Sequence, residues 1–180
     1  MIKGKKVLLR PVEERDLPLL VRWRNAPENR RFFFSPLLIN PGGQKKWYEE
    51  LLADRGRLLF VVDTVEGQTV GVMGLDKIDW RDQEAESGQI LFDPDQRGQG
   101  YAEEAMCLGL DYAFEELNLH RVYALVYASN PAITLFKLFG FQEEGVLRQA
   151  VFSGGRFQDK VILGLLREDW RGEQADAGTD

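Results

Sequence analysis

Two glycines and an arginine stand between a hydrophobic run and a long amphipathic helix, in the sequence DPDQRGQGYAEEA at residues 93–105. The preceding QILF is typical of a β-strand, and apolar residues recur at helical spacing from residue 101 to residue 117. Few local structures join a strand to a helix through a segment without bulky apolar side chains. Glycine permits positive φ and lets other groups approach the backbone closely. The stretch therefore predicts a strand–turn–helix unit whose turn leaves its backbone accessible.

The rest of the chain alternates between strand and helix patterns. A first helix is expected from Asp16, as its N-cap, to Asn25, and a second begins at Asn40 and Pro41, a cap followed by a first-turn proline. A short helix follows Asn130 and ends near residue 140. Strands are expected near the N-terminus, as a hairpin over residues 58–75, and at residues 87–92, 121–129, 145–152 and 158–166. The order β-α-α-β-β-β-α-β-α-β-β predicts an α/β (α+β) fold in which helices interrupt a mixed sheet.

Length and composition limit the classes of protein to consider. The 180 residues suit one domain over residues 1–170, and we expect residues 171–180 to form a flexible tail. No run approaches the ~20 apolar residues of a membrane span, and the N-terminus lacks the pattern of a signal peptide. One cysteine and one histidine give no metal-ligand spacing, so we expect a cytoplasmic protein without a metal.

Charge is distributed unevenly along the chain, which has a formal net charge of −6. Residues 1–31 carry nine Lys or Arg and four Asp or Glu, so the remainder is strongly acidic. An acidic body argues against a nucleic-acid partner and is compatible with a cationic substrate. A solvated acidic surface that aids solubility is the simpler interpretation of the same charges.

The turn at residues 93–100 has the physical features of an anion site. A strand-to-helix turn presents free backbone N–H groups at the positive end of the helix dipole. Gly98 and Gly100 place no Cβ between these groups and a phosphate, and Arg97 adds a positive charge. The spacing of a phosphate loop is absent, and Glu103 breaks the dinucleotide fingerprint. On local composition alone, a plain glycine-rich turn remains the alternative.

Two motifs resemble the GNAT superfamily of N-acetyltransferases. RGQGYA at residues 97–102 resembles its acetyl-CoA loop, Arg/Gln-x-x-Gly-x-Gly/Ala, and NPAITLFKLFGF at residues 130–141 resembles its second signature. VRWRNAPENRRFFFSP and SGGRFQDKVILGLLREDW are similar to the branch that holds ribosomal-protein N-terminal and spermidine acetyltransferases. The resemblance covers about residues 7–170. It implies a mixed, mostly antiparallel central sheet with helices on both faces, and direct transfer of an acetyl group from acetyl-CoA to an amine.

The resemblance also implies where the ligands bind. Two strands, ending at residues 92 and 129, would splay apart and bind the pantetheine arm through unpaired amides. The residues implied to bind acetyl-CoA are Leu91, Phe92, Arg97, Gly98, Gln99, Gly100, Tyr101, Ala102, Asn130 and Phe136. The end of the first helix, Trp23, Arg24 and Asn25, is implied to line the substrate pocket. Core packing for Trp23 and simple helix capping for Asn130 remain alternatives.

Catalysis requires a group that takes a proton from the ammonium form of the acceptor. The resemblance makes Glu86 the candidate base, with Asp79 and Glu84 in reserve, although Glu86 also fits an exposed residue of the charged run DWRDQEAE. Phe136 stands where the family commonly has a tyrosine acid. We expect this to lower the rate without abolishing turnover, because a thiol pKa near ~8.5 makes the thiolate a tolerable leaving group. Tyr127 or a water is the candidate substitute.

Two classes of function remain open. One is an N-acetyltransferase acting on a polyamine, an aminosugar, another small amine or a protein N-terminus; the other is a non-catalytic acyl-CoA-binding or regulatory module, which Phe136 keeps in consideration. An acidic pocket favours polyamines or aminosugars, and a groove open at the first-helix end favours a protein N-terminus. Cys107 is expected to be buried and His120 to lie at the surface. We expect a monomer or homodimer that binds neither nucleic acid nor membrane.

Overall fold

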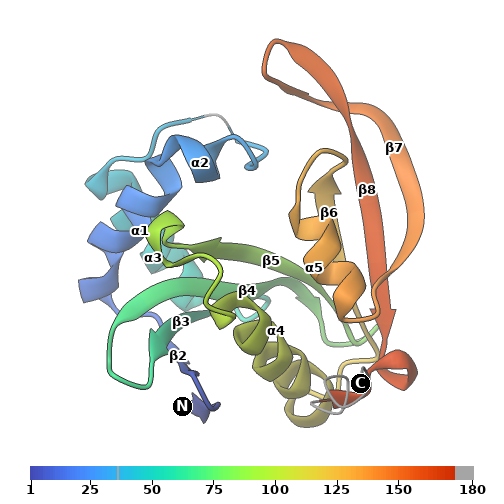
Figure 1. The fold of residues 1–180 in the computed structure, drawn as a ribbon, viewed down its shortest axis with the longest axis horizontal. Helices are drawn as coiled ribbons and strands as arrows, with labels where there is room; N and C mark the ends of the chain where they lie inside the picture. The colour runs from blue at the N-terminus through green and yellow to red at the C-terminus, as the bar shows by residue number, and fades with distance from the viewer. Residues whose placement is uncertain (36, 173–180) are drawn as a thin grey trace.

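The computed structural model describes residues 1–35 and 37–172, and in them eight strands form one sheet (Figure 1). The strand order is β1-β2-β3-β4-β5-β6-β8-β7, and only β5 and β6 run parallel. The strands are β1 (Ile2–Lys3), β2 (Val7–Pro11), β3 (Leu58–Thr64), β4 (Thr69–Asp79), β5 (Glu84–Phe92), β6 (Arg121–Tyr127), β7 (Gln142–Ser153) and β8 (Arg156–Leu166). Part of the expected tail, residues 173–180, lies outside the described residues.

Helices cover both faces of this sheet. They are α1 (Leu17–Asn25), α2 (Pro27–Arg30), α3 (Pro41–Ala53), α4 (Tyr101–Asp111) and α5 (Ala132–Leu138). Because side chains alternate along a strand, those of neighbouring residues of β3 point to opposite faces of the sheet. Val61 packs in one core cluster with α1 and α3, and Val62 packs in another with α4. The α+β class, with a mixed and mostly antiparallel sheet between helices, is confirmed.

The observed elements follow the expected order with small differences. The two-residue β1 and the four-residue α2 were not expected, and β5 begins three residues earlier than the alternating pattern indicates. The long helix is regular over α4 and then continues as one π-helical turn at Tyr112–Glu116. Its apolar stripe is continuous, so the sequence period alone does not mark the change of hydrogen-bond pattern.

The two expected N-caps turn out differently. Asn40 caps α3, because its side chain accepts a hydrogen bond from the N–H of Gly43 at 2.8 Å. Asp16 is the N-cap residue of α1, which ends at Asn25 as expected, but its carboxylate makes no capping bond to the helix. It accepts two bonds from the Arg10 guanidinium, each 2.8 Å, and one from the N–H of Glu13. A charged partner on the neighbouring strand β2 binds the carboxylate more strongly than helix amides would.

The sheet separates between β5 and β6. Their parallel pairing joins only residues 84–86 of β5 to residues 121–123 of β6. Beyond Glu86 the edge of β5 that faces β6 has no strand partner, while its other edge stays paired with β4 as far as Phe92. Figure 1 shows the two strands diverging, with α5 and the long β7–β8 hairpin on the β6 side. The divergence leaves unpaired backbone groups inside the sheet itself.

We predict that Asp16→Asn lowers the free energy of unfolding by about 2–3 kcal/mol at pH 7, because it leaves the nearly buried Arg10 guanidinium with one carboxylate, Asp63, in place of two. Burial raises the pKa of Asp16, but the hydrogen bonds from Arg10 and Glu13 outweigh it and hold the pKa below its usual value. The contribution is therefore complete above pH ~4 and is lost as the pH falls through the lower, folded pKa.

Urea unfolding of wild type and variant from pH 7 down to pH 3 measures this difference. Glu14→Gln, which removes an exposed ion pair with Lys45, is the control and should cost less than about 1 kcal/mol. If Asp16→Asn lowers the free energy of unfolding no more than the control does, or if its effect grows as the pH falls, the stabilising role of the Arg10–Asp16 pair is contradicted.

Candidate active site

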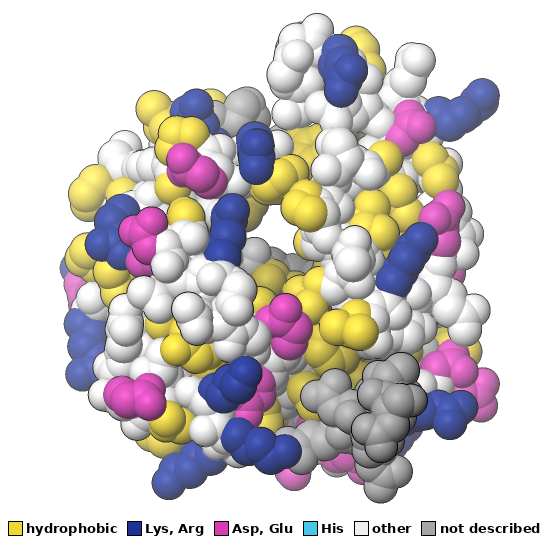
Figure 2. Space-filling view, in the orientation of Figure 1, with side chains coloured by type: hydrophobic (Ala, Val, Ile, Leu, Met, Phe, Trp, Pro, Cys, Tyr) yellow, Lys and Arg dark blue, Asp and Glu magenta, His cyan; other side chains and the backbone are white. Residues whose placement is uncertain are grey.

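The divergence of β5 and β6 opens a cleft of about 460 Å³. Figure 2 shows a hollow at this place, with hydrophobic side chains along its sides. A cleft of this size is in the range of small-molecule sites. Six of the ten residues implied to bind acetyl-CoA line it: Leu91, Phe92, Arg97, Ala102, Asn130 and Phe136. The remaining four are Gly98, Gln99 and Gly100 of the glycine turn and Tyr101, the first residue of α4.

The glycine turn has the open backbone that its sequence predicts. Gly98 and Gly100 both have φ near 78°, a left-handed conformation in which other residues are strained. In the described chain no backbone carbonyl accepts from the N–H groups of Gly98, Gln99 or Gly100. These donors lie directly before the first turn of α4, whose own N–H groups point the same way. The turn therefore combines unpaired donors with the positive end of a helix dipole.

A second cation lies beside this turn, and the sequence reasoning did not identify it. Lys6, before β2, donates from its ammonium group to the carbonyl of Gln99 at 3.2 Å. The Glu104 carboxylate on α4 accepts from the backbone N–H groups of Lys5 and Lys6 and holds this segment against the helix. The only signal was the basic character of the N-terminus, and nothing in the sequence indicated that it meets α4.

Asn29 connects the turn to the first helices and was also missed. Its side chain is buried, donates to the carbonyls of Trp23 and Phe92, and accepts from the Arg97 guanidinium at 2.8 Å. One amide thus fixes the end of α1, the end of β5 and the arginine of the turn. An asparagine in an exposed-looking sequence, APENRR, gives no sign of this role.

The polar residue in the middle of β5 shapes the wall of the cleft. Gln89 has φ 57°, and the register between β4 and β5 shifts at this point. Its side-chain amide donates to both oxygens of Asp76 on β4, at 3.1 and 3.0 Å, and Arg57 donates to the same carboxylate. The irregularity turns β5 at the place where a ligand would approach it, a common use of bulges beside active sites.

Of the three candidate bases, Glu86 alone lines the cleft. Its carboxylate lies 2.7 Å from the Lys77 ammonium group. This pairing is the largest cause that raises the pKa of Lys77 above its usual value. Glu84 forms an ion pair with Arg121 at 3.4 Å, and the Asp79 carboxylate accepts two backbone N–H groups of a turn.

Two aromatic residues stand near the candidate reaction site. Phe136 is buried, lines the cleft, and packs edge-to-face on Phe141 with 5.0 Å between ring centroids. Tyr127, the candidate acid, is also buried, but its hydroxyl donates to the carbonyl of Phe33 at 3.1 Å. Partial burial, and then the charge of Glu86, raise the pKa of Tyr123, which pairs in register with Glu86.

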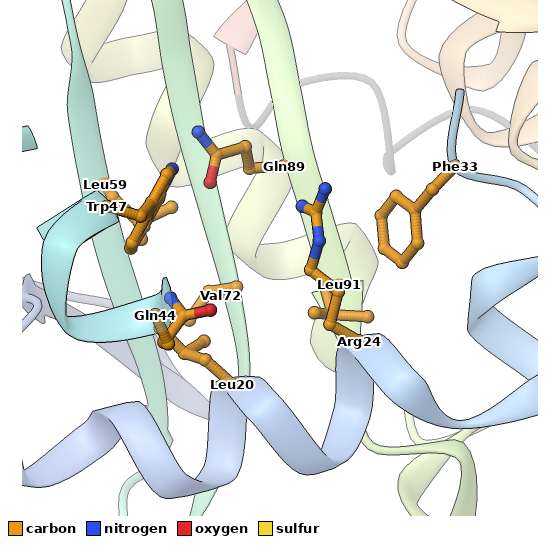
Figure 3. Close-up of a pocket in the computed structure, with 9 residues that line it drawn as sticks. All are labelled: Leu20, Arg24, Phe33, Gln44, Trp47, Leu59, Val72, Gln89 and Leu91. Atoms are coloured by element: carbon orange, nitrogen blue, oxygen red, sulfur yellow. The ribbon is translucent and has the colours of Figure 1, made fainter. Parts of the chain in front are cut away.

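The three residues at the end of α1 have different surroundings. Trp23 is 1% exposed and packs in the core cluster below α1. The Asn25 side chain exchanges hydrogen bonds with the backbone of Ile39 and fastens the loop before α3. Arg24 lines a smaller cavity between α1, α3 and β5, shown in Figure 3. This cavity adjoins the cleft, because Phe33, Gln89 and Leu91 line both.

The sequence also raised the questions of a metal site, a membrane span and the positions of Cys107 and His120. Among the described residues, no group of three or more His, Cys, Asp or Glu is placed to hold a metal ion. None of the helices in the described part of the chain is long and apolar enough to cross a membrane. Cys107 is half-buried in α4, and His120 is exposed between the π-helical turn and β6.

We predict that Gly98→Val removes the thermal stabilisation that acetyl-CoA gives the wild type, because the branched side chain occupies the approach to the unpaired amides. A ligand at 100 times its Kd stabilises the folded state by about 2.7 kcal/mol. Gly154→Val at the tip of the β7–β8 hairpin is a matched control, since both glycines have positive φ and no atom near the new Cβ. Melting temperatures are measured for both variants with and without acetyl-CoA. If acetyl-CoA raises the melting temperature equally in both, the phosphate site at the glycine turn is contradicted.

Comparison with known proteins places this geometry in a family. The model of the acetyltransferase (GNAT) domain matches residues 6–142. The spermidine N(1)-acetyltransferase of Vibrio cholerae is 31% identical to this chain, and the match covers 93% of this chain and 96% of that protein. The spermidine N(1)-acetyltransferase of Escherichia coli K12 is 28% identical, and the match covers 99% of this chain and 95% of that protein. The crystal structure of the Vibrio cholerae spermidine N-acetyltransferase with CoA and spermine has a TM-score of 0.86 at 30% identity, covering 92% of this chain and 98% of that one. The chain belongs to the GNAT family and is an N-acetyltransferase that uses acetyl-CoA as its cosubstrate.

Proposed function

We propose that this protein acetylates a primary amine that enters from the α1–α3 side of the cleft and meets the thioester beside Glu86. The observation that carries the proposal is the end of β5–β6 pairing at Glu86, which leaves one edge of β5 open to a ligand. An extended ligand arm can hydrogen-bond to such an edge as an added strand does. The residue at the point of separation then lies beside the deep end of that arm.

The cleft fits coenzyme A at both of its ends. Unpaired N–H groups of the glycine turn, with Arg97 and Lys6 beside them, suit the pyrophosphate. The open edge of β5 at Leu91 and Phe92 suits the amides of the pantetheine arm. Acetyl-CoA supplies the acetyl group as a thioester, which an amine attacks directly, so that the C–N bond forms as the C–S bond breaks.

Glu86 is proposed to take the proton that the amine must lose. A positioned carboxylate acts within hydrogen-bond reach or through one water. Lys77, its partner at 2.7 Å, is mostly exposed, so the acceptor can reach the carboxylate from the cleft side without displacing a buried ion pair. Asp79 and Glu84 are less suited, since each is engaged outside the cleft.

The departing thiolate is proposed to leave with little help from a side-chain acid. Phe136 offers no proton, and the Tyr127 hydroxyl is engaged with the carbonyl of Phe33. A thiol pKa near ~8.5 makes the thiolate a tolerable leaving group at neutral pH. A water in the cleft is the remaining proton donor.

The acceptor class has two lines of support that point in different directions. The similarity to spermidine acetyltransferases supports a polyamine as the acceptor. The carboxylates nearest the cleft, however, have cations of this chain as partners: Glu86 pairs with Lys77, and Asp76 with Arg57. Two paired carboxylates attract a polycation less than two free ones. The local charges therefore favour an amine with one ammonium group, and a polyamine is the second candidate.

We predict that Glu86→Gln lowers turnover by ~10²-fold, the usual scale for a lost acid–base group, and leaves acetyl-CoA affinity nearly unchanged. The substitution keeps the size of the side chain and removes the basic oxygen. Part of the rate should return at alkaline pH, where more of the amine is neutral. The measurement is release of CoA thiol from acetyl-CoA with a panel of primary amines, recorded as a pH–rate profile beside cofactor binding.

Glu84→Gln is the control for this experiment and should retain most of the activity. Equal rates for wild type and Glu86→Gln across the pH range would remove Glu86 from the mechanism. Thiol release that never exceeds the amine-free rate in wild type, with any amine of the panel, contradicts the proposed amine acceptor.

We predict that Phe136→Tyr keeps the fold and raises turnover or leaves it unchanged, because Phe136 lines the cleft in which the thioester is proposed to lie. Steady-state kinetics and melting temperatures measure both effects. If the tyrosine variant is stably folded but much slower than wild type, another group protonates the thiolate and the proposed position of the sulfur is wrong.

A further inference from the structure

We infer that the small cavity between α1, α3 and β5 binds an anionic oxygen group of the acceptor, a carboxylate or a phosphate, through Arg24 and Gln44. The inference rests on the proposed function, because it assigns this cavity to the same acceptor whose amine meets Glu86. The cavity measures about 60 Å³, more than the ~10–15 Å³ that one ordered water requires.

Arg24 supplies a cation that forms no ion pair with any described residue. It projects from the last turn of α1 along β5, as Figure 3 shows, with its guanidinium carbon 4.5 Å from the centre of the Phe33 ring. Among the described residues, no carboxylate or carbonyl accepts a hydrogen bond from it. Burial lowers its pKa, and the charge of Asp76 opposes this only in part. A half-buried guanidinium with free donors gains free energy when an anion binds.

Gln44 is the second, independent indication of a ligand. It lies in the first turns of α3 and is only 4% exposed, yet its carboxamide has no hydrogen-bond partner in the described part of the chain. Figure 3 shows the carboxamide at the cavity, across from Arg24. No group of the described residues occupies its NH₂ donors, so an oxygen group bound in the cavity can accept a hydrogen bond from them.

The remaining walls make the cavity selective. Leu20, Trp47, Leu59, Val72 and Leu91 are apolar, and no Asp or Glu lines the cavity. Asp76, the acidic group whose charge acts on Arg24, has both oxygens engaged by Gln89 and one by Arg57. A second ammonium group of a polyamine would meet Arg24 there with no carboxylate to balance it, so the cavity discriminates against a cation.

The position of the cavity connects it to the reaction. Phe33, Gln89 and Leu91 border both the cavity and the cleft that Glu86 lines. One acceptor can therefore place its anionic group at Arg24 while its amine reaches the cleft. Arg24 contacts the acceptor and sets specificity; it takes no part in proton transfer.

The first test measures binding without turnover. Sodium acetate and inorganic phosphate are titrated separately into the protein with acetyl-CoA bound, and the side-chain NH₂ signals of Gln44 are followed by NMR. We expect saturable shifts with one of the two anions, which identifies the carboxylate or the phosphate as the source. The shifts should vanish in Arg24→Gln and persist in Arg15→Gln, a control that alters an exposed arginine before α1. Absence of saturable shifts with either anion overturns the inference.

The second test compares acceptors in matched pairs. β-Alanine and its amide differ in a carboxylate, glucosamine 6-phosphate and glucosamine differ in a phosphate, and spermidine represents polycations. We expect kcat/KM to be at least ~10-fold higher for the anionic member of one pair, an advantage that Arg24→Gln abolishes. Arg24→Glu should raise kcat/KM for spermidine instead.

The two tests separate the possible failures. If wild type acetylates spermidine at least as well as every anionic amine, and Arg24→Glu does not improve it, the inference is wrong while the proposed function stands. If no amine is acetylated but Gln44 responds to an anion through Arg24, the anion site stands and the proposed function fails.

Discussion

The separation of β5 from β6 is the constraint on which the rest of the site depends. Three residues of parallel pairing hold the two strands together, and beyond Glu86 and Tyr123 each strand follows its other neighbour. A sheet interrupted in its middle exposes backbone donors and acceptors that water or a ligand must satisfy. The glycine turn continues the open edge of β5 directly into the positive end of α4. One break in a sheet thus supplies both a strand-like edge and an anion site.

Charges around the cleft follow a consistent arrangement. Glu86 and Asp76 are paired with Lys77 and Arg57, so the carboxylates next to the cleft are largely balanced. Arg24 differs from these groups, because it is half-buried, stacked on Phe33 and in no ion pair with a described residue, although the charge of Asp76 acts on it. The family fold explains the cofactor cleft, and the half-buried guanidinium of Arg24 lies on the side of the cleft from which the acceptor is proposed to enter.

The sequence was informative where structure is local. The strand, the glycine turn and the helix at residues 101–111 could all be predicted, since positive φ and helical periodicity are local properties. The Asn40 cap followed for the same reason. Asp16 has the expected N-cap position, but its carboxylate binds Arg10, on a strand, and makes no bond to the helix amides. Asn29, Lys6 and Gln44 acquire their roles only through contacts between segments far apart in the chain, which no local pattern reveals.

Amide hydrogen exchange tests the central claim, that acetyl-CoA lies along the open edge of β5. The account predicts that acetyl-CoA slows exchange in two segments, residues 87–92 of β5 and residues 97–102, which join the glycine turn to the start of α4. Exchange in the β7–β8 hairpin should not change, because that hairpin lies beyond β6 from the cleft. Protection of the turn without protection of β5 would contradict the added-strand arrangement, and protection of neither segment would contradict the site as a whole.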